Sequence, residues 1–420
     1  MIVYKSDRLL TTGTPKILER AAVLVEEDKI VWVGSQADWE HHAAHDYAEA
    51  VELGDKTLMP GLIDAHVHLG FDGSPAPVKR LEAETDLETI PLMIHTSRQL
   101  LSVGVTTARD LGARGYTDLV VRDAFASGTL QGPRLLTAGS PITSTGGHCW
   151  FLGGEADSLD EVRKLVREHH KAGVDHIKVM STGGFMTAGS APWFAQFTTE
   201  SLRIIVEEAH RVGKRVAAHC HGIEGIRRAV EAGVDTLEHC SFVHSDGTMG
   251  YDPALGEQIA ASGAYVSPTV SVLLKAINIE GFNERMQQLI ATGAKIITST
   301  DAGIDNVPHH AFPQSLPIYS DFGMSNAQIL QATTVTAAEA LGIGDVTGDI
   351  RAGLEADMIA VAGNPLADIS DVARLEYVVA RGRRFLPDPI PEIPDLPVDF
   401  IPMTENHKPA AFEREEATHV

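Results

Sequence analysis

The chain has 420 residues, of which 44% are hydrophobic and 22% charged, an ordinary globular balance with enough length for a large domain and an accessory one. Its formal net charge of −23 disfavours nucleic acid and anionic membrane surfaces as partners, and no apolar stretch is long enough to cross a bilayer. Three cysteines are too few for a disulfide framework. We therefore expect a cytoplasmic protein. The first residues lack the features of a signal peptide, although a chain from which a signal had been removed would look the same.

The first residues, up to about position 57, have the pattern of short strands. Apolar runs at residues 21–25 and 29–34 flank a short polar turn, which predicts a β-hairpin.

From residue 58 the pattern changes, because apolar strand-like runs now alternate with helix-like segments. The expected strands occupy residues 62–67, 104–110, 134–139, 175–180, 215–219, 234–239, 264–268 and 295–301. The expected helices occupy residues 116–127, 159–172, 199–212, 222–232, 284–292, 325–335 and 337–341. Eight strands alternating with helices predict an α/β fold of the (β/α)8, or TIM barrel, type.

Beyond Gly344 the strand pattern returns, and these strands most simply complete the N-terminal sheet. We therefore expect a small composite β-sandwich domain built from residues 1–57 and 346–385, beside a barrel domain of residues 58–345. Residues 386–420 begin with a proline-rich stretch that can be neither a central strand nor a helix, so we expect them to form a C-terminal tail.

Active sites of such barrels lie at the C-terminal ends of the strands. Side chains that can ligate metal ions or carry protons stand at five of these ends, namely His66 and His68, Lys178, His219 and His221, His239, and Asp301. His66 and His68 alternate with Val67 along a strand, so both project from the same face and can hold one metal ion. Each residue has an ordinary structural interpretation when taken alone, such as a helix cap for Asp301. Chance co-location at five strand ends is nevertheless improbable.

These residues lie in segments that resemble the amidohydrolase superfamily. The matching segments are residues 60–68 (Pro-Gly-Leu-Ile-Asp-Ala-His-Val-His), 104–107, 176–178, 218–222, 238–239, 299–303 and 348–358. The resemblance covers about residues 1 to 385 and implies a barrel with a composite β-sandwich, the same architecture that the strand pattern predicts.

The resemblance also implies a pair of divalent metal ions. His66 and His68 would bind the more buried ion together with Asp301. His219 and His239 would bind the second ion. Zinc suits a shell of imidazoles and carboxylates, and the sequence does not decide between zinc, manganese and cobalt.

By the same resemblance, Lys178 would bridge both ions as an N-carboxylated lysine. Carbon dioxide added to a neutral amine gives an anionic carbamate with two oxygen ligands, and burial favours the neutral amine that this reaction needs. Two divalent ions that share a hydroxide lower its pKa and orient it for attack.

Three residues are candidates for catalysis in this resemblance. Asp301 would take the proton from the bridging hydroxide during attack and pass it to the leaving amine. His221 lies on the same strand face as His219 but further out, where it could polarise the scissile carbonyl or hold the substrate. His148, after the third strand, is a second candidate for that task.

Within the superfamily the chain resembles the prolidase-like branch, which includes Xaa-Pro dipeptidases and amidases that cleave ochratoxin. The similar segments are residues 143–148 and 175–184, and Lys178 separates the chain from the deaminases, which typically keep one metal ion. The resemblance implies a homo-oligomer acting on a small-molecule substrate. That substrate would be a dipeptide or an N-acyl amino acid with a free C-terminal carboxylate, ochratoxin-like amides included.

The residues that would select such a substrate remain open. Arg109, Arg203 and His148 are candidates for binding the carboxylate, and the apolar loop at residues 185–197 is a candidate hydrophobic wall. Residues 309–314 depart from the usual pattern of the branch.

A cyclic-amide hydrolase of the imidazolonepropionase type and a phosphotriesterase-like hydrolase stay as alternatives. A non-enzymatic scaffold is disfavoured because every ligand position is present.

Overall fold

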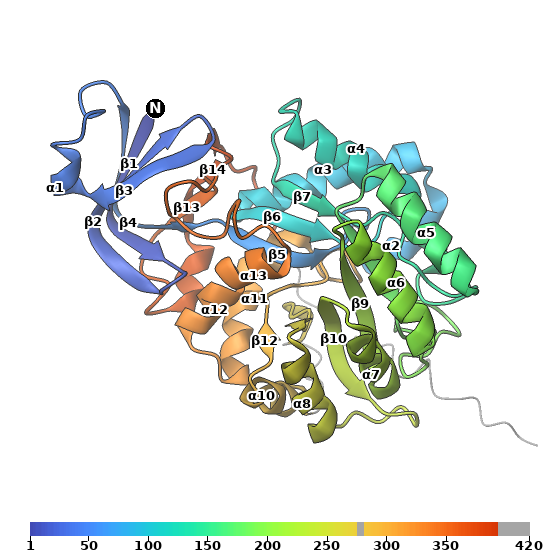
Figure 1. Cartoon of the computed structure of the whole chain (residues 1–420). Helices are drawn as coiled ribbons and strands as arrows, with labels where there is room; N and C mark the ends of the chain where they lie inside the picture. The colour runs from blue at the N-terminus through green and yellow to red at the C-terminus, as the bar shows by residue number, and fades with distance from the viewer. Residues whose placement is uncertain (275–280, 394–420) are drawn as a thin grey trace, which may run out of the picture.

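The structure, a computed structural model, describes residues 1–274 and 281–393 (Figure 1). Most of the expected C-terminal tail, residues 394–420, lies outside the described residues. The described strands form one seven-stranded sheet and two parallel sheets of five and three strands.

Both ends of the chain contribute to the seven-stranded sheet, whose order is β15-β14-β13-β4-β1-β2-β3. Its strands are β1 (Ile2–Thr11), β2 (Lys16–Glu26), β3 (Lys29–Ser35), β4 (Glu49–Pro60), β13 (Met358–Val361), β14 (Leu375–Ala380) and β15 (Arg383–Phe385). Figure 1 shows the blue N-terminal strands beside β13 and β14, which lie in the orange to red part of the chain. The composite origin is therefore as predicted, including the β2–β3 hairpin closed by the pair Glu26 and Lys29. The strands form one sheet, and not the two sheets expected of a sandwich, because β13 pairs directly with β4.

The two parallel sheets have the orders β5-β6-β7 and β12-β11-β10-β9-β8. Their strands are β5 (Leu62–Val67), β6 (Val105–Asp110), β7 (Arg134–Thr137), β8 (His176–Met180), β9 (Arg215–Gly222), β10 (Thr236–Val243), β11 (Tyr265–Ser267) and β12 (Lys295–Ile296). Isolated parallel bridges join the sheets at two seams, Ile142 with Val179 and Val67 with Ala302. All eight expected strands are present in a TIM-barrel-like arrangement, although the ladder is interrupted at the two seams. β12 is shorter than expected because Thr298 turns its N–H to the carbonyl of Ala332, outside the strand ladder.

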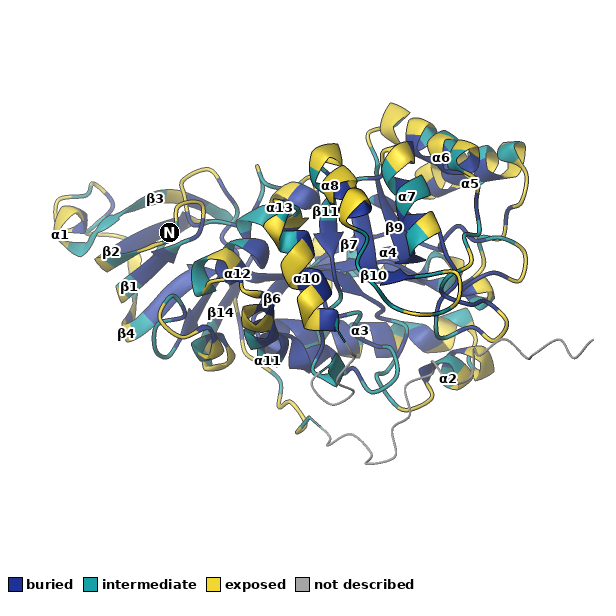
Figure 2. Ribbon diagram, turned by 90° about the horizontal axis from the view of Figure 1, so that it is seen from below, coloured by how far each residue is buried: buried dark blue, intermediate teal, exposed yellow. Residues whose placement is uncertain are grey.

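Helices follow the parallel strands, with their inner faces buried and their outer faces exposed (Figure 2). The α-helices of the described residues are α1 (Gln36–Trp39), α2 (Pro77–Ala83), α3 (Asp86–Ser102), α4 (Thr117–Ala126), α5 (Leu159–Ala172), α6 (Thr199–Arg211), α7 (Ile223–Ala232), α8 (Pro253–Ser262), α10 (Phe282–Ala291), α11 (Phe312–Ser315), α12 (Asn326–Ala332) and α13 (Val335–Ala340). The sequence pattern did not predict α3 or α8, nor the short helices α1, α2 and α11. Pro91 interrupts the pattern of α3, where the helix nevertheless begins with a capping box between Thr85 and Glu88.

Helix ends set the direction of the chain into the next strand. The helices α5, α7 and α8 each end at a glycine in the left-handed conformation, Gly173, Gly233 and Gly263, with φ values of 96°, 84° and 78°. Each glycine turns the chain back into the following strand, so the C-terminal ends of the strands meet at one mouth. No helix in the described parts of the chain is both long and apolar enough to span a membrane.

Candidate active site

A cavity of about 830 Å³ opens at the C-terminal ends of the parallel strands. Its described lining includes every residue that the sequence analysis proposed for metal binding or catalysis: His66, His68, His148, Lys178, His219, His221, His239 and Asp301. These side chains come from β5, β8, β9, β10 and the segments that follow β5, β7 and β12. The fold therefore brings together residues that are up to 235 positions apart in the chain, from 66 to 301.

One group of potential ligands surrounds Asp301. The Oδ1 atom of Asp301 lies 3.3 Å from Nε2 of His66 and 3.3 Å from Nε2 of His68, and the two Nε2 atoms are 3.4 Å apart. His66, His239 and Asp301 also offer ligand atoms that all lie within 4.8 Å of one another. The backbone of Asp301 is left-handed, with φ of 60°, and its N–H donates to the carbonyl of His66 over 2.9 Å. This strained conformation directs the carboxylate at the two histidines.

A second group consists of His219, His221 and His239, whose ligand atoms also lie within 4.8 Å of one another. The rings of His221 and His239 stack with centroids 4.4 Å apart, and the ring of His148 lies 4.5 Å from that of His219. Because His239 belongs to both groups, the two groups form one continuous cluster. His221 belongs to the second group together with the predicted ligands His219 and His239, so it is also placed to ligate.

Hydrogen bonds to fixed acceptors orient these rings. Thr269 donates its hydroxyl proton to the carbonyl of Pro268, so its oxygen accepts from Nδ1 of His239 over 2.8 Å. This leaves Nε2 of His239 as the nitrogen with the lone pair. In His219 the Nε2–H donates to the carbonyl of Gly183 over 3.0 Å, and Nδ1 carries the lone pair.

Burial gives the cluster the protonation states that a metal ion requires. Burial lowers the pKa of His66 to about 4 and that of His148 and His221 to about 3, and it holds the pKa of His219 and His239 well below the usual range. Neutral imidazoles can ligate a cation, whereas protonated ones cannot.

Asp301 keeps its negative charge in this setting. Burial opposes ionisation of Asp301, but His66, His68 and Lys178 outweigh it and hold the pKa of the carboxyl well below its usual range. Its Oδ1 atom is buried and makes no hydrogen bond within the described part of the chain. A carboxylate oxygen without a hydrogen bond, surrounded by neutral imidazoles, is the donor set that a divalent cation such as zinc fits.

Lys178 is 1% exposed, and its Nζ lies 3.4 Å from Nε2 of His66. Burial lowers the pKa of this amine, with Glu238 and Asp301 acting against the shift. Burial therefore makes the neutral amine, which is the form that can react with carbon dioxide, easier to reach than in an exposed lysine.

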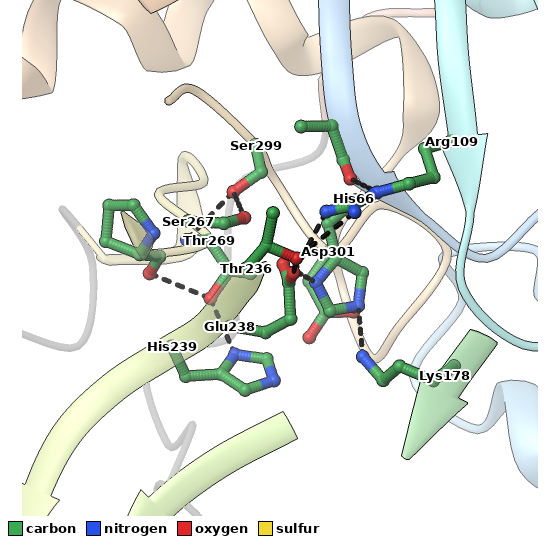
Figure 3. A network of polar contacts seen from close by, with 12 residues as sticks. His66, Arg109, Lys178, Thr236, Glu238, His239, Ser267, Thr269, Ser299 and Asp301 are labelled. Atoms are coloured by element: carbon green, nitrogen blue, oxygen red, sulfur yellow. Dashed lines mark hydrogen bonds and ion pairs between the residues drawn. The ribbon is translucent and has the colours of Figure 1, made fainter. Parts of the chain in front are cut away.

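A buried charge network holds His66 through its Nδ1 atom (Figure 3). Glu238 is 0% exposed and accepts hydrogen bonds from Nδ1 of His66 over 2.9 Å, from Arg109 over 2.9 Å and from Thr236 over 2.6 Å. Burial opposes ionisation of Glu238, but Arg109 and His66 outweigh it and keep its pKa well below the usual range. Since Nδ1 of His66 donates to Glu238, its Nε2 is left with the lone pair that faces Asp301.

This network changes the interpretation of the proposed carboxylate-binding residues. Arg109 is fully buried against Glu238, and its Nε donates to the carbonyl of Ala65, so it is committed to the network and lies outside the described lining of the cavity. Arg203 is exposed on α6, also outside that lining. His148 is the member of the three that lines the cavity.

Apolar side chains form most of the remaining wall of the cavity. Of the expected apolar loop, Phe185 and Met186 belong to the described lining, whereas Phe194 is 57% exposed. Other apolar lining residues are Phe71, Met180, Met249, Leu273, Phe282 and Ile304.

Sequence analysis missed Glu238 and a lining arginine, Arg285. In both cases the sequence did contain a signal. A charged residue stands at a position that belongs to the buried face of a strand or helix.

Replacing Glu238 by Gln should weaken metal binding by about 10- to 100-fold, because the amide can present its NH2 group to His66 and so disturb the tautomer that leaves Nε2 free to ligate. Competition with a chelating indicator measures the affinity. The exposed Glu224→Gln on α7 is the control. Unchanged zinc affinity in a folded Glu238→Gln protein would contradict the orienting role.

Comparisons with known proteins agree with this geometry. Residues 57–384 match the model of the Amidohydrolase family. The chain is similar to ochratoxinase of Aspergillus niger, with 30% identity over 415 residues that cover 88% of this chain and 82% of the relative. It is also similar to imidazolonepropionase of Bacillus velezensis, with 24% identity covering 82% of this chain and 83% of the relative.

Solved structures give the same picture. A crystal structure of a Xaa-Pro dipeptidase with bound methionine in its active site has 28% identity and a TM-score of 0.81, covering 91% of this chain and 99% of the other. The crystal structure of A. niger ochratoxinase has 28% identity and a TM-score of 0.79, covering 91% and 95%. The protein thus belongs to the amidohydrolase family, in its prolidase- and ochratoxinase-like branch, and is a hydrolase that acts on C–N bonds.

Proposed function

We propose that this protein is a binuclear metal-dependent amidohydrolase that cleaves the amide bond of dipeptides or N-acyl amino acids with a free C-terminal carboxylate. The observation that carries the proposal is the continuous cluster of neutral imidazoles around Asp301, with the buried amine of Lys178 beside His66. The similarity to ochratoxinase and to a Xaa-Pro dipeptidase supports this substrate class.

In this proposal His66, His68 and Asp301 hold one ion, while His219 and His239 hold the other. Lys178, carrying a carbamate from carbon dioxide, contributes anionic oxygens to both. Zinc suits the donor set of imidazoles and carboxylates. When bound, such ions polarise the substrate carbonyl and lower the pKa of water.

Asp301 moves the proton in the proposed reaction. Its carboxylate lies in the cavity, is ionised and is fixed by the left-handed backbone at that position. It accepts a proton from the attacking water and delivers that proton to the nitrogen of the leaving amine, so that the C–N bond breaks as an amino acid departs.

His221 and His148 hold the acyl part of the substrate. The Nδ1 atom of His221 is 2.8 Å from the hydroxyl of Ser241, which orients the ring beside those of His219 and His239. The backbone N–H of His148 donates to Gln196 over 2.6 Å, and Gly184 leaves room for its ring, since a Cβ there would lie 2.4 Å from it. Both rings are thereby placed to direct a hydrogen bond at the scissile carbonyl.

The substrate class is tested with protein prepared in the presence of zinc and bicarbonate. We expect release of free amino acid from Xaa-Pro dipeptides and N-acyl-phenylalanine, measured by chromatography, with kcat/KM well above that for cyclic amides and phosphotriesters. Faster turnover of an imidazolone-type cyclic amide would contradict the proposal. It would favour the activity named for the 24% identical relatives.

Asp301→Asn should reduce kcat by about 10²- to 10⁴-fold, because an amide cannot carry the proton from water to the leaving amine. Asp118→Asn is the matched control, since this buried carboxyl hydrogen-bonds to the N–H groups of Gly139 and Leu119, and burial raises its pKa to about 7. Metal content is measured on each sample. Near-normal turnover of Asp301→Asn with full metal content would show that Asp301 is a ligand alone.

A further inference from the structure

The helix α10 carries a charged residue on its buried face. Its buried positions are Phe282, Arg285, Met286 and Leu289, which have the spacing of a stripe that faces the core. Three of the four are apolar, and the fourth, Arg285, is 5% exposed. A guanidinium at a core-facing position is unusual, because removing its charge from water is costly.

Arg285 lines the same cavity as the metal-ligand cluster. Its Nη2 lies 3.5 Å from the sulfur of Met249, and Phe282 belongs to the same stretch of wall. Burial lowers the pKa of Arg285, and Glu284 acts against the shift. The guanidinium thus places N–H donors and a positive charge at the wall of the cavity.

The other charged groups of the described lining do not offer the same chemistry. Lys178 and Asp301 belong to the cluster, and Asp305 is a carboxyl. The ring of His148 lies 4.5 Å from that of His219, and an imidazole cannot present two parallel N–H donors to both oxygens of a carboxylate. A guanidinium presents five N–H donors in a planar fork, which matches both oxygens of a carboxylate.

We propose that Arg285 binds the carboxylate of the substrate and thereby selects amides whose leaving group is an amino acid. The inference rests on the proposed function and adds to it the residue that reads the leaving group. In this arrangement Arg285 holds the carboxylate end of the substrate, and the scissile amide lies at the metal-ligand cluster. Its apolar groups pack against wall residues such as Phe71, Phe185 and Ile304.

The test compares the wild-type protein with Arg285→Met and Arg285→Lys, and uses Arg203→Met on the exposed face of α6 as the control. The paired substrates are N-benzoyl-L-phenylalanine and its C-terminal carboxamide, with benzoate release as the readout. We expect the wild type to prefer the acid, and Arg285→Met to lose about 100-fold in kcat/KM on the acid with little change on the carboxamide. Arg285→Lys should fall between them, because it keeps the charge without the fork. Arg203→Met should match the wild type.

A binding measurement separates this inference from the proposed reaction. Calorimetry on the zinc-loaded protein compares L-phenylalanine with L-phenylalaninamide, and does not depend on turnover. Tighter binding of the acid by the wild type, lost in Arg285→Met, supports the carboxylate site even if neither benzoyl substrate is cleaved. A preference for the acid that persists unchanged in Arg285→Met, or no preference in the wild type, would overturn it. Melting temperatures close to that of the wild type show that the variants are folded.

Discussion

The burial of ionisable side chains at the mouth of the barrel is the constraint on which the rest of the site depends. Transferring a charge from water into a protein interior costs several kcal/mol unless it is paired and hydrogen-bonded. The imidazoles meet this constraint by staying neutral, as their lowered pKa values show. Glu238 and Arg109 meet it by pairing over 2.9 Å, with Thr236 as a further donor. Asp301 meets it in part through His66 and His68, and its Oδ1 oxygen is left for a cation.

The scaffold achieves this arrangement with short-range geometry. A period of two along β5 and β9 sends His66 and His68, and also His219 and His221, to the same side. Left-handed backbone at His239 and Asp301, with φ values of 68° and 60°, turns these side chains out of the regular strand direction. Backbone strain of this kind is maintained where the surrounding structure fixes it, and both residues lie at the centre of the cluster.

Sequence reasoning predicted the strands, and the gathering of the candidate residues around one cavity, because both depend on local rules. Alternation of strands and helices gives a barrel, and strand ends give its active-site mouth. It did not reach features that depend on contacts between distant residues. Glu238 is held by Arg109, 129 positions away, and by His66, and Arg109 could be taken for a substrate-binding residue until its pairing with Glu238 was seen. The single composite sheet likewise depends on β13 pairing with β4. Arg285 was hidden because helical periodicity marks a buried face without saying whether that face meets a core or a cavity.

The central claim is that the cluster holds two metal ions linked through Lys178. Anomalous diffraction at the zinc edge, from crystals grown with zinc and bicarbonate, tests it most directly. The account predicts two zinc peaks, one beside His66, His68 and Asp301 and the other beside His219 and His239, with carbamate density on the Nζ atom of Lys178. A single peak, or two peaks beside an unmodified lysine amine, would contradict the account.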